Sequence, residues 1–235
     1  MILPLKNSVV LFIAFLIPHY AKIIFTREFC STLAKVYGDS VLAGMGISSK
    51  LMFIGTFIFM GFAAGCQPLV GFNYGAKNYK RVREIFKTGM TMTFGIGVVL
   101  TVIFWFGASE LVSFFTSLPD VISQGTIVIR ISIFSFLILG PQMLASTGIQ
   151  AFGKAKESLI LSVARQGVVY IPLIFAMESL FGFKGLIWAQ PNADAITLGI
   201  ILVLLAVILN KTTSEKVESA ESYTSPKKPA IYEQP

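Results

Sequence analysis

The stretch from Gly61 to Arg83 reads G-F-A-A-G-C-Q-P-L-V-G-F-N-Y-G-A-K-N-Y-K-R-V-R. It begins as an apolar membrane helix, carries a Gln-Pro pair at Gln67 and Pro68, and breaks at residues 71–75. It then leaves the bilayer through a loop that holds Lys77, Lys80, Arg81 and Arg83. An apolar run that ends in glycines and clustered positive charge is typical of a helix reaching the cytoplasmic face of a membrane.

Composition places the whole chain in the membrane class. Of its 235 residues, 54% are hydrophobic and 13% are charged, and the mean hydropathy is +0.75. A soluble domain needs roughly a quarter charged residues to cover its surface. Apolar runs recur that can cross about 30 Å of hydrocarbon at about 20 residues each. The predicted fold class is therefore all-α and integral to the membrane.

The apolar runs predict a bundle of six transmembrane helices. The spans are expected at 9–25, 41–72, 88–115, 121–152, 159–181 and 186–209. The first span carries Pro18, His19 and Lys22, and a signal peptide is its alternative; we favour a retained span because no small-x-small cleavage site follows Phe25. The chain then divides into 1–36 as a doubtful first transmembrane segment, 37–209 as the bundle and 210–235 as a disordered, Ser/Thr/Glu/Lys/Pro-rich tail.

Charge sets the expected orientation. The formal net charge is +7, but the basic residues cluster between apolar runs, so a nucleic-acid partner is not indicated. Seven of them lie in the loops after the second and fourth predicted spans, whereas the loops after the first, third and fifth spans hold only Lys184 at their centres. The positive-inside rule therefore assigns the loops after the second and fourth spans to the cytoplasm. With six spans both termini are cytoplasmic. The expected location is a bacterial inner membrane, with the lipid bilayer as surroundings.

Ionisable residues inside the predicted spans are the first candidates for function. Asp194 lies near the middle of its span, where an ionised carboxylate costs at least about 2.5 kcal/mol on insertion scales. It either binds a proton, a cation or a cationic substrate, or it makes a structural hydrogen bond or an ion pair with Arg130 or Arg165. Arg165 is close enough to the cytoplasmic end to snorkel. Glu110 and Glu178 fall near the outer face and are expected to be solvated.

Prolines and glutamines form a second pattern. Pro68, Pro141, Pro172 and Pro191 fall in four different spans, where each frees the carbonyl four residues back and favours a kink. Gln67, Gln142 and Gln190 adjoin three of them, and each amide can bond a freed carbonyl or a ligand. Kinked helices with amides in a cavity suit a transporter that alternates between two states. Ordinary kinks of membrane helices are the alternative.

The sequence gives no support for catalysis. It contains no Ser-His-Asp set, no His/Cys cluster for a metal and no glycine loop that would cradle a phosphate. Cys30 and Cys66 lie in apolar surroundings and are interpreted as small buried side chains. We therefore expect no enzyme activity, no catalytic residue and no cofactor.

Three blocks resemble the multidrug and toxic compound extrusion (MATE) family. They are Q-P-L-V-G-F-N-Y-G-A-K-N-Y-K-R-V (67–82), A-R-Q-G-V-V-Y-I-P-L (164–173) and G-L-I-W-A-Q-P-N-A-D (185–194). The resemblance implies the second six-helix half of a twelve-helix transporter that exports cationic amphipathic compounds in antiport with Na⁺ or H⁺. It implies a partner, either a separate first half or a second copy of this chain. The candidate substrate and ion pathway is Gln67, Asn73, Tyr74, Arg130, Gln142, Gln166, Gln190 and Asp194.

The sequence also departs from the family. The resemblance is expected to run from about Leu33 to Asn210, and residues 1–29 do not look like the seventh span of the family, which suggests a misread frame. The family's acidic cation site in its seventh and tenth spans is not carried over, because 121–152 contains no acid. Two alternatives stay open: an inactive truncated remnant, and a lipid-linked saccharide flippase of the same superfamily.

Overall fold

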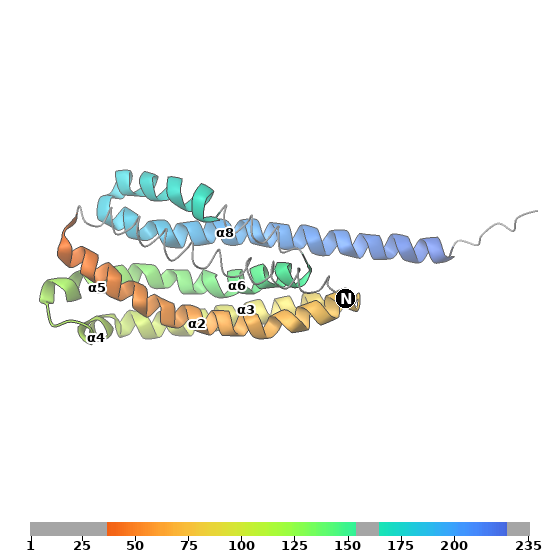
Figure 1. Ribbon diagram of the computed structural model, residues 1–235, viewed down its shortest axis with the longest axis horizontal. Coiled ribbons are helices and arrows are strands. Elements are labelled where there is room, and N and C mark those ends of the chain that lie inside the picture. The colour runs from red at the N-terminus through yellow and green to blue at the C-terminus, as the bar shows by residue number, and fades with distance from the viewer. Residues whose placement is uncertain (1–36, 154–164, 225–235) are drawn as a thin grey trace, which may run out of the picture.

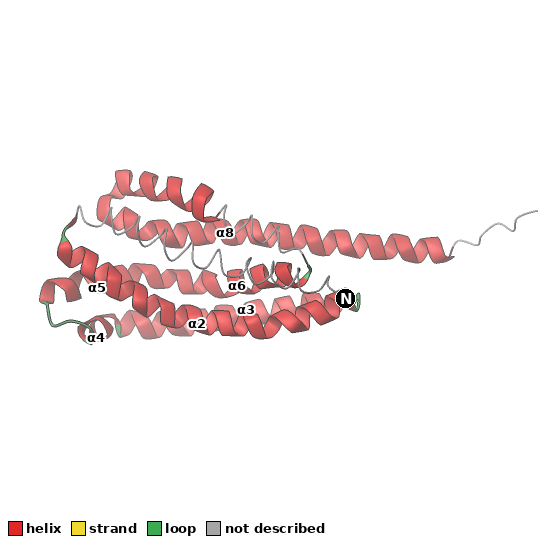
Figure 2. Cartoon of the chain, in the orientation of Figure 1, coloured by secondary structure: helices red, strands yellow, loops and turns green. Residues whose placement is uncertain are grey.

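The computed structural model describes residues 37–153 and 165–224, with side-chain detail for 37–153 and 168–209. The described residues form helices joined by short turns and contain no strand (Figure 1; Figure 2). The stretches long and apolar enough to cross a membrane are Asp39–Gly75, Tyr79–Phe106, Pro119–Ala151 and Val168–Leu209. The predicted all-α membrane fold is confirmed. The first predicted span lies outside the described residues, so the count of six stays a prediction.

A short turn links the first two described helices. Helix α2 (Asp39–Gly75) ends before Lys77, whose φ of 57° lies in the left-handed region that side chains rarely adopt. Asn78 then caps α3 (Tyr79–Phe106), because its side chain accepts a hydrogen bond from the Arg81 N–H at 3.3 Å. The predicted basic loop is therefore too long. Lysine and arginine favour helix, and α3 accordingly begins at Tyr79, before most of the basic residues. Its first turns carry Lys80, Arg81, Arg83 and Lys87.

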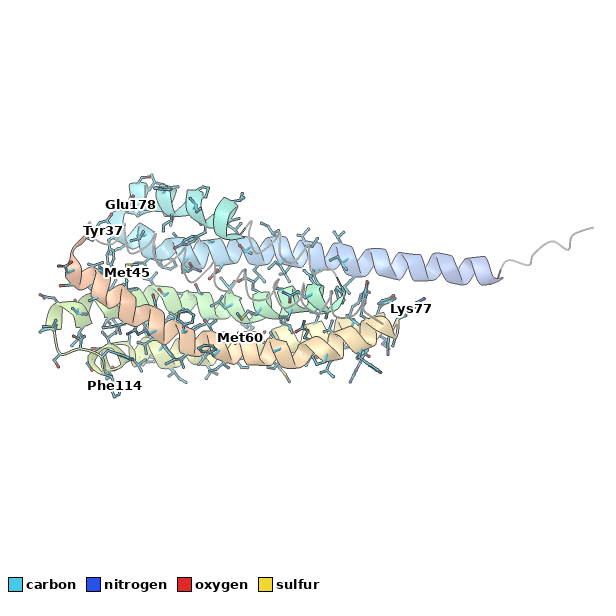
Figure 3. The ribbon with its side chains drawn as sticks, viewed as in Figure 1. Tyr37, Met45, Met60, Lys77, Phe114 and Glu178 are labelled. Carbon is cyan, nitrogen blue, oxygen red and sulfur yellow. The ribbon has the colours of Figure 1, made fainter. Side chains whose placement is uncertain are left out.

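The opposite end of the bundle is built from shorter pieces. Helix α3 ends at Phe106 rather than at residue 115, and α4 (Ala108–Ser113) begins after Gly107. Helix α5 (Pro119–Ser132) starts with a proline, whose missing N–H is not needed in the first turn of a helix. Figure 3 labels Phe114 at this end and Lys77 at the other. The basic residues of the opening stretch are thus confined to one end.

The predicted span 121–152 is interrupted in the structure. One 3₁₀ turn, η2 (Ile133–Ser135), separates α5 from α6 (Phe136–Ala151). Helix α6 lies at the centre of the bundle, where it packs against α2, α3 and α8. A Cβ added to Gly97 would lie 2.5 Å from the carbonyl oxygen of Phe136, so α3 and α6 touch backbone to backbone. Membrane helices use such small residues to approach closely.

The fifth and sixth predicted spans form a helical hairpin. The π-helical turn η3 (Arg165–Tyr170) leads into α8 (Ile171–Thr224), which is interrupted at Gly182 with φ 56° and ψ −138°. The two arms run back along one another from this residue (Figure 1). The predicted turn at 181–185 is thus contracted to one residue, which must be glycine-like because its φ is positive.

Helix α8 extends further than the sequence indicates. It runs to Thr224, so helix replaces the predicted disorder over 210–224. Those residues are mostly Lys, Glu, Ser, Thr and Ala, and they continue an existing helix without the cost of nucleating a new one. Residues 225–235 lie outside the described residues.

Three clusters of buried side chains hold the bundle together. One joins α2, α3, α6 and α8 and includes Val70, Phe86, Leu144, Ile149 and Leu205. The second lies nearer Phe114's end and includes Leu51, Phe59, Phe104, Ile129 and Phe136. The third joins the start of α2 to the hairpin through Val41, Tyr170, Ile174, Leu186 and Ala193. Large apolar side chains also cover the outside of the bundle, as contact with lipid requires.

Candidate functional site

Asp194 is the most deeply buried ionisable side chain of the candidate pathway. Its exposed fraction is 0%, and it lies on the second arm of the hairpin. Gln190, one turn earlier, donates from Nε2 to both carboxylate oxygens of Asp194, at 3.2 and 3.3 Å. The spacing of four residues puts the two side chains on one face of the helix. Gln190 therefore fixes the orientation of the carboxylate.

Gln142 is buried without a hydrogen bond. Its exposed fraction is 2%, and neither its Oε1 nor its Nε2 has a partner in the structure. Gly140, two residues earlier, faces Thr93 and Phe59 on the α3 and α2 side of α6. Two residues turn a helix by about 200°, so Gln142 lies on the opposite side of α6, the side left for α8. Ser135 lies seven residues before it on the same face, and its Oγ is also unpartnered.

Other buried hydroxyls are satisfied within their own helices. Ser48, Thr93 and Thr197 each donate to the carbonyl four residues back, at 2.7–2.8 Å. Such bonds are the ordinary way in which a membrane helix accommodates Ser and Thr. The unpartnered amide of Gln142 is therefore a distinct feature of the core. Buried polar groups without a partner are rare in native proteins and require an explanation.

The pathway residues at the end of α2 have local roles in the structure. The Asn73 side chain donates to the Leu69 carbonyl at 2.8 Å. The Tyr74 ring packs on Phe152 at 4.3 Å and on Tyr79 at 5.7 Å between centroids. Gln67 is half-buried. These contacts tie the end of α2 to α3 and α6.

The remaining predicted positions separate by exposure. Pro141 and Pro191 are buried, whereas Pro68 and Pro172 are exposed. Gln166 lies in η3, and its side chain is outside the described detail. Of the two roles expected for the proline-adjacent amides, a bond to a freed carbonyl is not seen for Gln142 or Gln190, and a bond to a ligand stays a prediction. The amide of Gln190 donates to Asp194, and that of Gln142 has no partner among the described residues.

Arg130 is held by an aromatic ring. Its Cζ lies 5.7 Å from the ring centroid of Trp105, and the residue is exposed. Phe134 then packs edge-on against Trp105 at 5.9 Å and stacks on Trp188 at 5.7 Å with an interplanar angle of 18°. The suggested ion pair of Arg130 with Asp194 is not formed within the described part of the chain. The one feature of the sequence that points to this aromatic group is the rarity of tryptophan: the chain has two, and both belong to the group.

Glu178 is not simply a solvated carboxylate. It is half-buried and accepts a hydrogen bond of 3.0 Å from the hydroxyl of Tyr37, which lies just before α2. Burial, with the neighbouring Glu178 carboxylate, raises the pKa of Tyr37 above its ordinary value of 10.0. The neutral phenol is thus the favoured form. The bond fastens the first arm of the hairpin to the beginning of α2.

Comparison with known proteins identifies the family. A family model described as MatE matches residues 9–176. The chain is 31% identical over 186 residues to the Multidrug export protein MepA of Staphylococcus aureus (strain MSSA476), covering 77% of the chain and 41% of that protein. Its identity to MepA of Staphylococcus haemolyticus (strain JCSC1435) is 27%, with 79% and 40% covered. The chain thus spans about two fifths of the length of these curated relatives.

Solved structures share the fold. The bent form of the Vibrio cholerae MATE transporter VcmN superposes with a TM-score of 0.75 at 20% identity, covering 80% of this chain and 43% of that one. A MATE protein in complex with MaL6 gives 0.84 at 14% identity, with 91% and 49% covered.

The family match corrects one boundary. It begins at residue 9, so the expectation that the likeness starts near Leu33 is wrong. The distinctive blocks on which that expectation rested all lie later in the chain. Residues 9–30 are part of the match. The chain is a multi-pass membrane protein and belongs to the MatE family, whose members are transporters and not enzymes.

Proposed function

We propose that this chain is a six-helix half of an exporter that moves cationic amphipathic compounds out of the cell in exchange for Na⁺ or H⁺. Its membership of the MatE family and its 31% identity to a multidrug export protein support this activity. The chain spans 41% of that relative, so the proposed transport also needs a second bundle of helices.

The observation that carries the proposal is the complete burial of Asp194 in a membrane helix. A buried carboxylate is costly unless it is protonated or paired with a cation. Binding and release of H⁺ or Na⁺ at Asp194 therefore changes the free energy of the bundle strongly. Such a change is needed to couple movement of the ion to export of the substrate. Gln190 holds the carboxylate in place through the bonds to its two oxygens.

Gln142 supplies the second polar group of the proposed pathway. Its amide offers one acceptor and two N–H donors that no described residue uses. In one state of an alternating cycle, water or substrate would bond to this amide. In the state described by the structure the residue is buried, with an exposed fraction of 2%.

The proposed location is a bacterial inner membrane with both termini in the cytoplasm. The basic residues at the α2–α3 turn support this orientation, because clustered Lys and Arg mark cytoplasmic segments. The bacterial origin of the MepA relatives supports the choice of membrane.

An efflux assay with Asp194→Asn tests the proposal. Cells would express this chain alone, and together with the N-terminal half of the S. aureus relative, and loss of ethidium would be followed by fluorescence. We expect export only from the pair, and its loss in Asp194→Asn at equal amounts of protein in the membrane. Asp120→Asn is the matched control, since Asp120 is exposed in the first turn of α5.

Other outcomes would favour the alternatives. Unchanged efflux and unchanged pH and Na⁺ dependence in Asp194→Asn would make this carboxylate structural. No efflux from the intact sequence in either combination would favour an inactive remnant. Movement of a labelled lipid-linked saccharide without ethidium export would favour a flippase.

A further inference from the structure

We propose that Arg130, Trp105 and Trp188 form a binding site for the phosphate headgroup of an anionic membrane lipid. The site lies at the end of the bundle away from the basic α2–α3 turn and is independent of the proposed transport pathway. It assigns Arg130 to the lipid surface instead of to that pathway.

The site is assembled from three separate elements. Trp105 comes from the last turn of α3, Arg130 from α5 and Trp188 from the second arm of the hairpin. Phe134 of η2 lies between the two indoles and contacts both rings. Arg130 is exposed, and the two tryptophans are 40% and 38% exposed. A ligand can therefore reach the guanidinium and both indoles from outside the bundle.

The guanidinium retains its capacity to bind an anion. In a cation–π contact the aromatic ring attracts the positive charge of the guanidinium and does not accept all of its N–H groups. N–H donors at the edge of the guanidinium therefore remain available for a ligand. No carboxylate in the described part of the chain pairs with Arg130. An arginine fork matches the oxygens of a phosphate, and each tryptophan carries one indole N–H donor. The chemistry of the site thus fits a phosphate group.

The depth of the site fits a lipid headgroup. The second arm of the hairpin spans about 40 Å from Gly182 to residue 209, about 10 Å more than the hydrocarbon. Trp188 lies about 9 Å along the helix from the turn at Gly182, so it falls within a few ångströms of the hydrocarbon boundary. Tryptophan is enriched at this level of the membrane.

The surrounding surface favours lipid over a water-soluble anion. Exposed apolar side chains flank the site on α3 and α5, including Val102 (49%), Phe106 (78%) and Ile127 (36%). Acyl chains would cover such a surface, while a polar solute would not. A lipid satisfies both parts of the surface at once, with its phosphate on Arg130 and its chains on the apolar neighbours.

Tryptophan fluorescence provides a direct test, because the only two tryptophans of the chain belong to the site. The full chain would be reconstituted in phosphatidylglycerol/phosphatidylethanolamine vesicles with a nitroxide on carbon 5 or carbon 12 of the acyl chain. We expect at least twofold stronger quenching by the carbon-5 label. Stronger quenching by the carbon-12 label would place the tryptophans deep in the membrane and overturn the proposal.

A titration in detergent tests the role of Arg130. Adding phosphatidylglycerol should change the emission, and Arg130→Gln should need at least tenfold more lipid for half the change. Arg130→Lys should keep part of the affinity, and Lys184→Gln, an exposed cation near the hairpin turn, should titrate like the native sequence. Equal titration by Arg130→Gln, or an equal response to inorganic phosphate, would contradict a lipid site at this arginine.

Discussion

At the residue scale, most buried polar side chains of the described core are hydrogen-bonded, whereas Gln142 and Ser135 are not. Asp194 is buried with Gln190 as its donor, and the buried threonines bond to their own helices. Gln142 has no such partner. A buried polar group without a hydrogen bond costs about 1–3 kcal/mol, so its presence lowers stability in the described state. A cost of this kind is tolerated where another state uses the group.

Replacing Gln142 by leucine should separate stability from activity. We expect Gln142→Leu to raise the free energy of unfolding by about 1 kcal/mol, because it removes an unpartnered amide of similar size, and to reduce efflux. Thermal unfolding in detergent and the ethidium assay would measure the two effects. Thr93→Val is the control and should lower stability, since it loses the bond to Gly89. If Gln142→Leu proves the less stable variant, the amide has a partner in the membrane.

At the scale of elements, the helices are held at distances that only small residues permit. Helices α3 and α6 meet at Gly97, where the Phe136 carbonyl occupies the place of a side chain. Without a hydrophobic effect between helices in lipid, close packing of this kind supplies much of the attraction. The position of α6 at the centre of the bundle therefore depends on Gly97.

Alanine at Gly97 should move α3 away from α6. Overpacking of this kind typically costs about 1–3 kcal/mol, and we expect Gly97→Ala to lower the unfolding temperature accordingly. Gly95→Ala is the matched control on the same helix, because a Cβ there has no neighbour within 4 Å. It should be neutral or slightly stabilising, since alanine favours helix over glycine by about 1 kcal/mol. Equal effects of both changes would mean that the contact at Gly97 is not tight.

At the scale of the whole molecule, charge differs between the two ends. The α2–α3 end carries Lys77, Lys80, Arg81, Arg83 and Lys87, and the other end carries Glu110 and Asp120. Each end therefore has its own preferred side of the membrane. The bundle can be oriented by labelling one residue at each end.

Cysteine labelling should report this orientation. In a background with Cys30 and Cys66 replaced by alanine, Ser117→Cys should react with a membrane-impermeant maleimide in intact cells. Lys77→Cys should react only after the membrane is permeabilised. Both positions are exposed, so access to the side chain does not limit the reaction. The reverse pattern would invert the proposed topology.

The all-α membrane fold class and the family followed from the sequence, because they depend on composition and on distinctive blocks. Boundaries were less predictable. The start of α3 depends on the Asn78 cap, and the hairpin turn depends on the positive φ of Gly182. Hydropathy is averaged over many residues and does not detect features that involve one residue. The contact between Asp194 and Gln190 could be predicted from the sequence, because the two residues are four positions apart on one helix. The arrangement of Trp105, Phe134 and Trp188 was not, because it brings together three elements far apart in the chain.

The single-residue turn at Gly182 has a consequence for how the chain is made. A connection without a loop leaves only a very short stretch, which includes the charged Lys184, to be carried across the membrane ahead of the second arm. The two arms would therefore be inserted into the membrane together as a helical hairpin. The first arm would not be inserted until the ribosome has made the second arm. A ribosomal pause just after Gly182 would leave Tyr170 and Ile174 of the first arm without Leu186 and Ala193, the residues of the second arm that cover them.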